Sequence, residues 1–327
     1  MKTYNSKIIT LIVAILLLAV QITGCAPQKK SSFVIGVVAP APSMEPVLQG
    51  FKEGMAEKGF IEGKNVTYIY HGPLGADATK LEAEVQSFVD AKVDLILSLA
   101  TPATVAAQKV TAGTKIPVVF TPISDPLGAG FVESINKPGG NMTGVRNGGF
   151  TPKNLEWLKT IVPSIKKIYA PYNPKDKSAI FARGLLLETA AKLGIEVVTP
   201  EITTADDIPG VLANMPEDID AIFCLSDSMV ISRVADIVAA ANERKIPVTA
   251  VSRAHVEAGT LMGFGSEFNT VGKQTAGVAA QILNGADPST LPVEESEYFL
   301  FLNQKTADSL GITFPDEALK AAAGVIR

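Results

Sequence analysis

Cysteine and histidine are scarce in this sequence of 327 residues, which contains two of each. Their thiolates and imidazoles are the usual protein ligands of transition metals, and here they form no cluster along the chain, so no metal site is expected. Cys224 lies inside the apolar run AIFCLS, which is typical of a small buried hydrophobe. The only other cysteine is Cys25, near the start of the chain, and no disulfide is expected.

Charge is sparse as well. Charged side chains make up 19% of the residues and the formal net charge is -4, so nothing indicates a nucleic-acid partner. The sequence also lacks a Gly-x-Ser-x-Gly nucleophile elbow, a phosphate-binding Gly-x-x-x-x-Gly-Lys loop and a complete three-glycine dinucleotide loop. We therefore expect neither enzymatic activity nor a bound cofactor.

The first 24 residues have the pattern of an export signal. Lys2 and Lys7 precede an apolar run from 8 to 20 that is too short for a membrane span. The tetrapeptide ITGC (22–25) resembles a bacterial lipobox, which implies a signal peptide at 1–24, a lipid on Cys25 and a linker within 25–32. The protein is then expected outside the cytoplasmic membrane and anchored by lipid. The alternative is a cleaved signal followed by an accidental cysteine.

Downstream of the linker, strand-like apolar runs alternate with amphipathic helical stretches, as in parallel α/β sheets. The expected strands lie at 33–40, 65–70, 94–100, 116–121, 166–173, 194–200, 220–226 and 246–252. The expected helices lie near 46–58, 77–91, 102–112, 178–193, 204–214 and 228–243. The second half of this order repeats the first, which predicts an α/β protein with two doubly wound parallel-sheet lobes.

The repeat is visible in the residue sequence itself. DLILSLA (94–100) and DAIFCLS (220–226) are each followed by an Ala-rich helix and a Lys-Ile-Pro-Val segment. The chain left over after the second lobe is long enough to cross between the lobes, and we expect three crossings, at 146–149, 265–268 and 299–303. The expected lobes are therefore 33–147 plus 267–299 and 148–266 plus 300–327.

The loops that follow the parallel strands are where a ligand site is expected. In the first lobe, Thr101 is a candidate N-cap and Pro102 suits the first helical position, which leaves backbone donors that, with the hydroxyl of Thr101 or Thr104, can bind a carboxylate. An ordinary capped helix is the alternative. Ser124 is a further contact at the end of the next strand.

In the second lobe the equivalent turn carries an acid, Asp227. This side chain either caps the helix that follows or offers a negative charge to a ligand ammonium group. Anion-binding donors in one lobe and a carboxylate in the other would suit a zwitterion. Arg146, at an expected crossing, can either clamp a carboxylate or form an ion pair at the hinge.

Short motifs then point to a family. They are GFKEG (50–54), GKNV (63–66), ATPA (100–103), PVVF (117–120), PGGNMTGV (138–145), YNP (172–174), Asp227, KIPV (245–248) and LPV (291–293). With them the sequence resembles, over nearly the whole mature chain, the ABC-transporter substrate-binding family that includes tryptophan and tyrosine binders. The resemblance implies a type I periplasmic-binding fold with three crossings and a small ligand held between the lobes.

The resemblance also implies further ligand contacts: Ala103, Tyr172, Asn173, Glu267 and Phe268. The family often has His-Pro after the first strand and Asp-Tyr near the second crossing, where this chain has APSM (41–44) and Glu267-Phe268, so an aromatic ligand does not follow from the motifs alone.

The function implied is that of a monomeric substrate-binding lipoprotein. It captures an amino acid or similar zwitterion by hinge closure and delivers it to an ABC permease with its ATPase. The alternative is a lipoprotein that senses a ligand and signals to a membrane receptor without transport.

Overall fold

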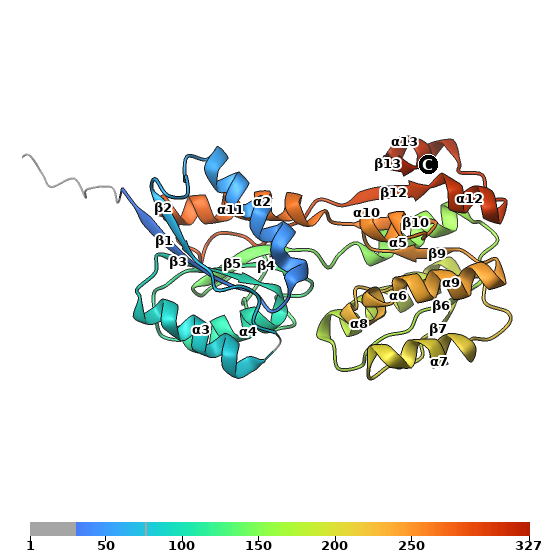
Figure 1. Ribbon diagram of the computed structural model, residues 1–327, viewed down its shortest axis with the longest axis horizontal. Helices are drawn as coiled ribbons and strands as arrows, with labels where there is room; N and C mark the ends of the chain where they lie inside the picture. Colours follow the sequence, from blue (N-terminus) through green and yellow to red (C-terminus); the bar gives the residue numbers. More distant parts are fainter. Residues whose placement is uncertain (1–30, 76) are drawn as a thin grey trace, which may run out of the picture.

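The computed structural model describes residues 31–75 and 77–327. The expected signal peptide, Cys25 and most of the linker lie outside these residues. The described chain forms two α/β lobes that lie side by side, with the first lobe at the left of Figure 1 and the second at the right. Three segments of chain pass between them.

The first lobe contains a parallel sheet and four α-helices. Its strands are β1 (Phe33–Val38), β2 (Val66–Ile69), β3 (Leu95–Leu99), β4 (Val118–Ile123), β5 (Met142–Arg146) and β11 (Glu294–Glu295). They are ordered β11-β5-β4-β3-β1-β2, and every neighbouring pair is parallel. Its helices are the 3-10 turn η2 (Pro42–Met44), α2 (Glu45–Glu57), α3 (Ala78–Asp90), α4 (Ala100–Thr111) and α11 (Phe268–Leu283).

The helices cover both faces of this sheet, which is why its strands are apolar throughout. Helices α2 and α11 lie on one face of the sheet and α3 and α4 on the other (Figure 1). Each pair buries its apolar side chains in a separate core cluster. The α2 and α11 backbones approach closely at Gly50 and Gly272. A Cβ atom on Gly50 would lie 2.0 Å from the Asn269 carbonyl oxygen, and one on Gly272 would lie 2.1 Å from that of Val47. This contact fixes α11 to the first lobe.

The second lobe contains a seven-stranded sheet. Its strands are β6 (Lys167–Tyr169), β7 (Glu196–Val198), β8 (Ala221–Phe223), β9 (Val248–Ala250), β10 (Met262–Gly265), β12 (Phe299–Asn303) and β13 (Ala322–Ile326). The order is β13-β12-β10-β9-β8-β6-β7, and only the β10–β12 pair is antiparallel. The helices are α5 (Thr151–Ile161), α6 (Lys177–Leu193), η3 (Ala205–Asp207), α7 (Ile208–Ala213), α8 (Ser228–Ser232), α9 (Val234–Arg244), α10 (Arg253–Glu257), α12 (Gln304–Leu310) and α13 (Asp316–Ala321).

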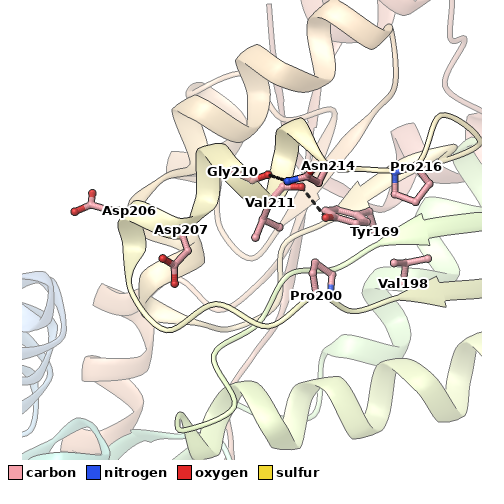
Figure 2. A pocket seen from close by; sticks show the side chains of 9 residues that line it. All are labelled: Tyr169, Val198, Pro200, Asp206, Asp207, Gly210, Val211, Asn214 and Pro216. Atoms are coloured by element: carbon pink, nitrogen blue, oxygen red, sulfur yellow. Dashed lines mark hydrogen bonds between the residues drawn. The ribbon is translucent and has the colours of Figure 1, made fainter.

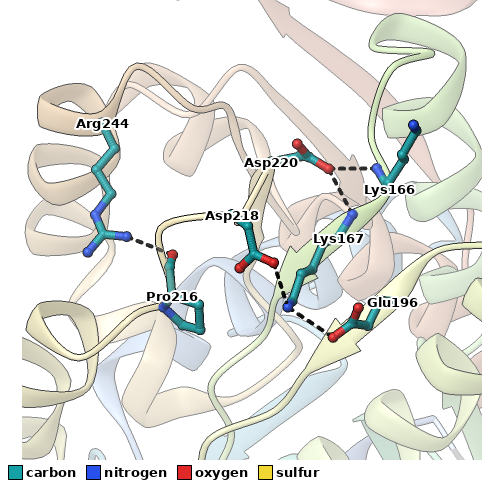
Figure 3. Close-up of polar contacts among 7 residues, drawn as sticks. All are labelled: Lys166, Lys167, Glu196, Pro216, Asp218, Asp220 and Arg244. Atoms are coloured by element: carbon teal, nitrogen blue, oxygen red, sulfur yellow. Dashed lines mark hydrogen bonds and ion pairs between the residues drawn. The ribbon is translucent and has the colours of Figure 1, made fainter.

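The internal repeat is confirmed by strand order, since β2-β1-β3-β4-β5 in the first sheet corresponds to β7-β6-β8-β9-β10 in the second. It extends to single side chains. Asp94 Oδ2 accepts a hydrogen bond of 2.8 Å from the Val34 N–H, which joins the start of β3 to the start of β1. At the same place in the second lobe, Asp220 Oδ2 accepts from the N–H groups of Lys166 and Lys167 at 2.7 and 2.8 Å (Figure 3).

Other polar contacts reinforce the same edge of the second sheet (Figure 3). Lys167 Nζ lies 2.9 Å from Asp218 Oδ2 and 3.1 Å from Glu196 Oε1, which ties β6 to β7. The bonds to these two carboxylates raise the pKa of Lys167. This edge holds the amino ends of the strands, so the contacts stabilise the lobe at the end away from the expected ligand site.

Two crossings lie where the sequence predicts them and the third does not. The chain leaves β5 at Arg146 and enters α5 of the second lobe, and it leaves β10 at Gly265 and enters α11 of the first. The segment 299–303 is strand β12, because Phe299 pairs with Gly265 in the second sheet. The third crossing is therefore 296–298, between β11 and β12, and the expected boundary at 299 falls inside the second sheet.

The last strand and one helix also differ from expectation. The helix expected over 228–243 is divided at Arg233, whose φ of -115° and ψ of 21° lie outside the helical range. The Ala-rich segment 322–326 forms β13 although its composition favours a helix, because it pairs with β12 and this tertiary pairing outweighs helix propensity. Cys224 is fully buried in the second lobe, as predicted, and burial raises the pKa of its thiol to about 12.

Candidate functional site

The carboxyl ends of the strands in both sheets adjoin the crossings. The first crossing leaves the carboxyl end of β5, the second leaves that of β10, and the third leaves that of β11. Short connections therefore bring the strand ends of one lobe toward those of the other. In an open α/β sheet this edge is where ligands bind, and a molecule placed there would touch both lobes.

In the first lobe the helix start at this edge is built differently from the prediction. Helix α4 begins at Ala100, its N-cap residue is Leu99, and no side chain caps it, so Thr101 is not the N-cap. Ala100 has a φ of 65°, in the left-handed region that residues other than glycine rarely adopt. Such strain is typical of functional turns. The first turn of α4 beside it has no side-chain acceptor.

The Thr104 hydroxyl is engaged within the first lobe. It donates to the Ala100 carbonyl oxygen and lies 3.0 Å from both that atom and Ser98 Oγ, and its residue is fully buried. Ala103 is equally buried, in the core beneath α4. The Thr104 and Ala103 side chains therefore pack beneath the strained turn on its core side. Thr101, by contrast, is partly exposed.

In the second lobe Asp227 caps α8. Its Oδ1 accepts from the N–H groups of Met229 and Val230 at 2.9 and 3.2 Å, and its Oδ2 accepts from the Asn173 N–H at 2.6 Å. The residue is 1% exposed. The capping interpretation is thus confirmed, and the carboxylate also ties the end of β8 to the loop after β6. A contact with a ligand ammonium group stays a prediction.

Tyr172 and Asn173 lie beside Asp227 but are engaged within their own lobe. The Tyr172 hydroxyl donates to Glu201 Oε1 at 3.0 Å, and the Arg183 guanidinium lies 4.7 Å from its ring centre. Burial, and then the bond to Glu201, raise the pKa of this phenol. Asn173 Oδ1 accepts from the Lys175 N–H at 2.9 Å and shapes the turn before α6.

Three predicted residues adjoin the crossings themselves. Ser124 follows β4, and its carbonyl oxygen packs closely against Gly148. A Cβ atom on Gly148 would lie 2.1 Å from this oxygen. Glu267 occupies the N-cap position of α11 without a side-chain capping bond, and Phe268 begins that helix and packs on the core of the first lobe. The predicted residues thus fall into three groups, at the α4 start, around Asp227 and along the crossings.

The polar residues beside and within the third crossing are not among those predicted from the sequence. Arg146 Nε lies 2.5 Å from Glu295 Oε2, so the hinge ion pair is the alternative that the structure supports for Arg146. Glu295, Ser296 and Tyr298 carried no local signal, because the residues that they contact at the first crossing are about 149 positions away in sequence.

A groove of about 630 Å³ elsewhere in the second lobe contains none of the predicted residues (Figure 2). It lies between β7 and α7, and at its floor the Tyr169 hydroxyl donates to the Val211 carbonyl oxygen at 2.8 Å. Asp207 on its rim accepts from the backbone N–H groups of Thr203 and Thr204, which lower its pKa to about 2.

Within residues 31–75 and 77–327, no group of three or more His, Cys, Asp or Glu side chains could hold a metal.

Two doubly wound lobes, three crossings and strand ends that adjoin them define a type I periplasmic-binding-protein fold. Residues 33–326 match the model of the family described as ABC transporter substrate binding protein. The chain belongs to this family, whose members bind solutes and are not enzymes.

Known proteins are similar to this chain over nearly its whole length. The chain is 28% identical over 324 residues to a tyrosine-binding protein of Clostridioides difficile, covering 94% of this chain and 92% of the relative. It is 30% identical to the solved ABC domain from Streptococcus pneumonia in complex with L-Trp, with a TM-score of 0.81 and coverage of 90% and 100%. A ligand-free, open substrate-binding protein from Clostridium difficile is 29% identical, with a TM-score of 0.75 and coverage of 90% and 99%.

Membership places the protein outside the cytoplasm, where the substrate-binding proteins of ABC importers act. Across the residues that the structure describes, no helix has both the length and the apolar character needed to cross a bilayer.

Proposed function

We propose that this protein is a lipid-anchored substrate-binding protein that captures an amino acid between its lobes and delivers it to an ABC permease and its ATPase. The observation that carries the proposal is the similarity, across about nine-tenths of the chain, to a structure in complex with L-Trp and to a tyrosine-binding protein. Aromatic amino acids are therefore the first candidates, although Glu267-Phe268 replaces the acid–tyrosine pair of the family.

Two ends of the site suit the two charges of an amino acid. The start of α4 has backbone donors, the positive end of the helix dipole and no side-chain cap, which favours a carboxylate beside Thr101. Asp227, across the crossings, is a buried acid whose Oδ1 already accepts two N–H groups, whereas its Oδ2 accepts one and has a lone pair left for a ligand donor. In this arrangement the ligand carboxylate contacts the first lobe and the ammonium contacts the second.

The remaining predicted residues either support the two contacts from within a lobe or line the space between the lobes. Thr104 and Ala103 hold the α4 turn, while Tyr172 and Asn173 hold the loop that Asp227 touches. Ser124, Glu267 and Phe268 line the approach along the crossings, where the ligand side chain would lie. Tyr172 and Asn173 reach the ligand only if closure rearranges their loop.

The ligand drives closure because it contacts both lobes only when they approach. Binding with a micromolar dissociation constant supplies about 8 kcal/mol at the standard state. This exceeds the few kcal/mol that separate open and closed states of such proteins, so a bound ligand makes the closed state dominant. The permease then recognises the closed form.

The test is isothermal titration of the twenty amino acids into the purified protein. We expect saturable 1:1 binding of at least one of them, with L-tyrosine and L-tryptophan as the first trials. Binding of none of the twenty, by a protein that unfolds cooperatively, would contradict the proposed ligand class while leaving the family assignment intact.

A further inference from the structure

Polar contacts join the crossings to one another. We call one cluster of them the hinge brace: Arg146 and Gly149 of the first crossing, Glu295 at the end of β11 and Tyr298 of the third crossing. Arg146 Nε lies 2.5 Å from Glu295 Oε2, and the Tyr298 hydroxyl donates to Glu295 Oε1. The Gly149 N–H donates to the Tyr298 oxygen at 3.2 Å. The hydroxyls of Ser266 and Ser296, both buried, lie 2.6 Å apart and link the second crossing to the third.

Backbone contacts show which lobe each crossing follows. In the first crossing the Asn147 N–H donates to the Ile123 carbonyl oxygen at 3.0 Å, and Gly148 packs against Ser124, so the chain follows the first lobe as far as Gly148. In the second crossing a Cβ atom on Gly265 would lie 2.0 Å from the Val251 carbonyl oxygen, so this segment follows the second lobe.

The beginning of the third crossing is bonded to the first lobe. Glu295 pairs with Arg146 in the β11–β5 register, and the Ser296 N–H donates to the Arg146 carbonyl oxygen at 2.8 Å. The Arg146 and Glu295 side chains, which are 32% and 35% exposed, are thus held together on one lobe. They form a fixed ion pair rather than a link between lobes.

Tyr298 belongs to the other lobe. Its ring centre lies 5.5 Å from that of Phe150 and 6.0 Å from that of Phe264, and it packs against the core of the second lobe. The bond from its hydroxyl to Glu295 therefore joins the two lobes at the hinge. Rotation about the segments after Gly148, Gly265 and Ser296 would change the separation of this donor and acceptor.

We propose that the Tyr298–Glu295 bond, with Arg146 as the positioning residue for the carboxylate, sets the resting angle between the lobes. The bond is charge-assisted and half-buried, and Arg146 holds the Glu295 carboxylate in place, so the arrangement with the bond intact is favoured over arrangements that break it. The brace lies beside the ligand site without being part of the proposed zwitterion contacts. It thereby tunes apparent affinity through the open–closed balance, whatever the ligand is.

The experiment measures the distance between the lobes without ligand. Spin labels are placed on exposed positions of the two lobes, Lys80→Cys and Glu243→Cys, with Cys25→Ser to prevent a third label. The inter-label distance distribution is then recorded for the labelled protein and for the added changes Tyr298→Phe and Glu295→Gln. We expect both changes to shift or broaden the distribution, while thermal unfolding stays cooperative.

Matched controls make the same chemical changes within one lobe. Glu294→Gln alters the neighbouring carboxylate, which accepts from Gln274 of α11 at 2.8 Å, and Tyr169→Phe removes a hydroxyl bonded inside the second lobe. Both should leave the distribution unchanged. Distributions for Tyr298→Phe and Glu295→Gln that match the parent, or shifts that the two controls reproduce, would overturn the proposal. Tyr298→Phe keeps the aromatic packing, so the comparison survives even if Glu295→Gln folds poorly.

Discussion

Asp227 shows how one side chain combines two roles. It caps α8 and accepts the Asn173 N–H, and both bonds hold its carboxylate at the edge of the second lobe. Asparagine is an equally good N-cap through its single oxygen, but its amide nitrogen cannot accept the Asn173 N–H, so Asp227→Asn has a structural cost for any ligand. A role in recognition adds a dependence on the ligand's own charge.

We predict that Asp227→Asn weakens binding of L-tyrosine by roughly 30-fold or more, equivalent to about 2 kcal/mol, because an ammonium group loses its counter-charge. The same change should weaken binding of the analogue that lacks the amino group much less, because that ligand is affected only through the lost bond to the Asn173 N–H. Titration calorimetry of both ligands measures the difference. Equal losses for the two ligands would assign Asp227 a structural role alone, and Asp77→Asn, at the N-cap of α3, is the matched control.

Thr104 carries a second prediction at this scale. Thr104→Val leaves Ser98 Oγ buried without its partner and frees the Ala100 carbonyl oxygen, so the free energy of unfolding should fall by about 1–3 kcal/mol. Denaturant unfolding measures this, with Thr67→Val on the exposed side of β2 as the control. An unchanged stability would show that the hydroxyl does not support the turn.

Among the elements, the α2–α11 pair decides whether the chain after the second crossing stays on the first lobe. Gly272→Ala places a methyl group 2.1 Å from the Val47 carbonyl oxygen and 2.6 Å from the Phe51 nitrogen, so the helices must separate. We expect a loss of about 1–3 kcal/mol in denaturant unfolding. Gly277→Ala, five residues along the same helix, meets only Lys58 Cε at 3.7 Å and should be neutral or stabilising. Equal effects of the two would contradict this packing.

The 3-10 turn η3 gives a pH-dependent prediction. Backbone N–H groups of Thr203 and Thr204, together with the threonine hydroxyls, lower the pKa of Asp207 to about 2 from its ordinary 3.8. A lowered pKa means that the carboxylate stabilises the fold fully above about 4 and that this contribution is lost as the pH falls toward 2. Asp207→Ala should therefore be less stable than the parent at pH 7 and should approach it near pH 2. A stability gap independent of pH would exclude the charged cap.

The elements that could be predicted from sequence are those whose signal is local. Apolar runs located β1 to β4 in the first sheet and β6 to β9 in the second, and the repeated motifs DLILSLA and DAIFCLS each begin with an aspartate that makes the equivalent bond in its lobe. Other features depend on partners far away in sequence. The strand β13 forms from an Ala-rich segment only because β12 lies beside it, and the inward turn of Thr104 follows from the strained Ala100, which no residue pattern indicates.

At the scale of the whole molecule, two rigid lobes and three short crossings leave few ways to move. The clusters of buried side chains lie within each lobe, whereas the crossings are joined by a handful of polar bonds and one aromatic group. Closure by rotation about the crossings therefore disturbs little packed surface, which is what a binding protein that opens and closes repeatedly requires.

The anchor is a separate prediction for the whole chain. If Cys25 carries lipid, the protein expressed in a bacterial host should fractionate with membranes, and Cys25→Ser should release it into the soluble extracytoplasmic fraction with its ligand affinity unchanged. Immunoblotting of fractions measures this. An unchanged membrane association would mean that something other than Cys25 holds the protein there.

Small-angle X-ray scattering of the protein with and without the amino acid identified by titration tests hinge closure most directly. We predict that the radius of gyration falls at saturation, because the two lobes approach around the ligand. A radius that stays the same while one equivalent of ligand is bound would contradict closure between the lobes.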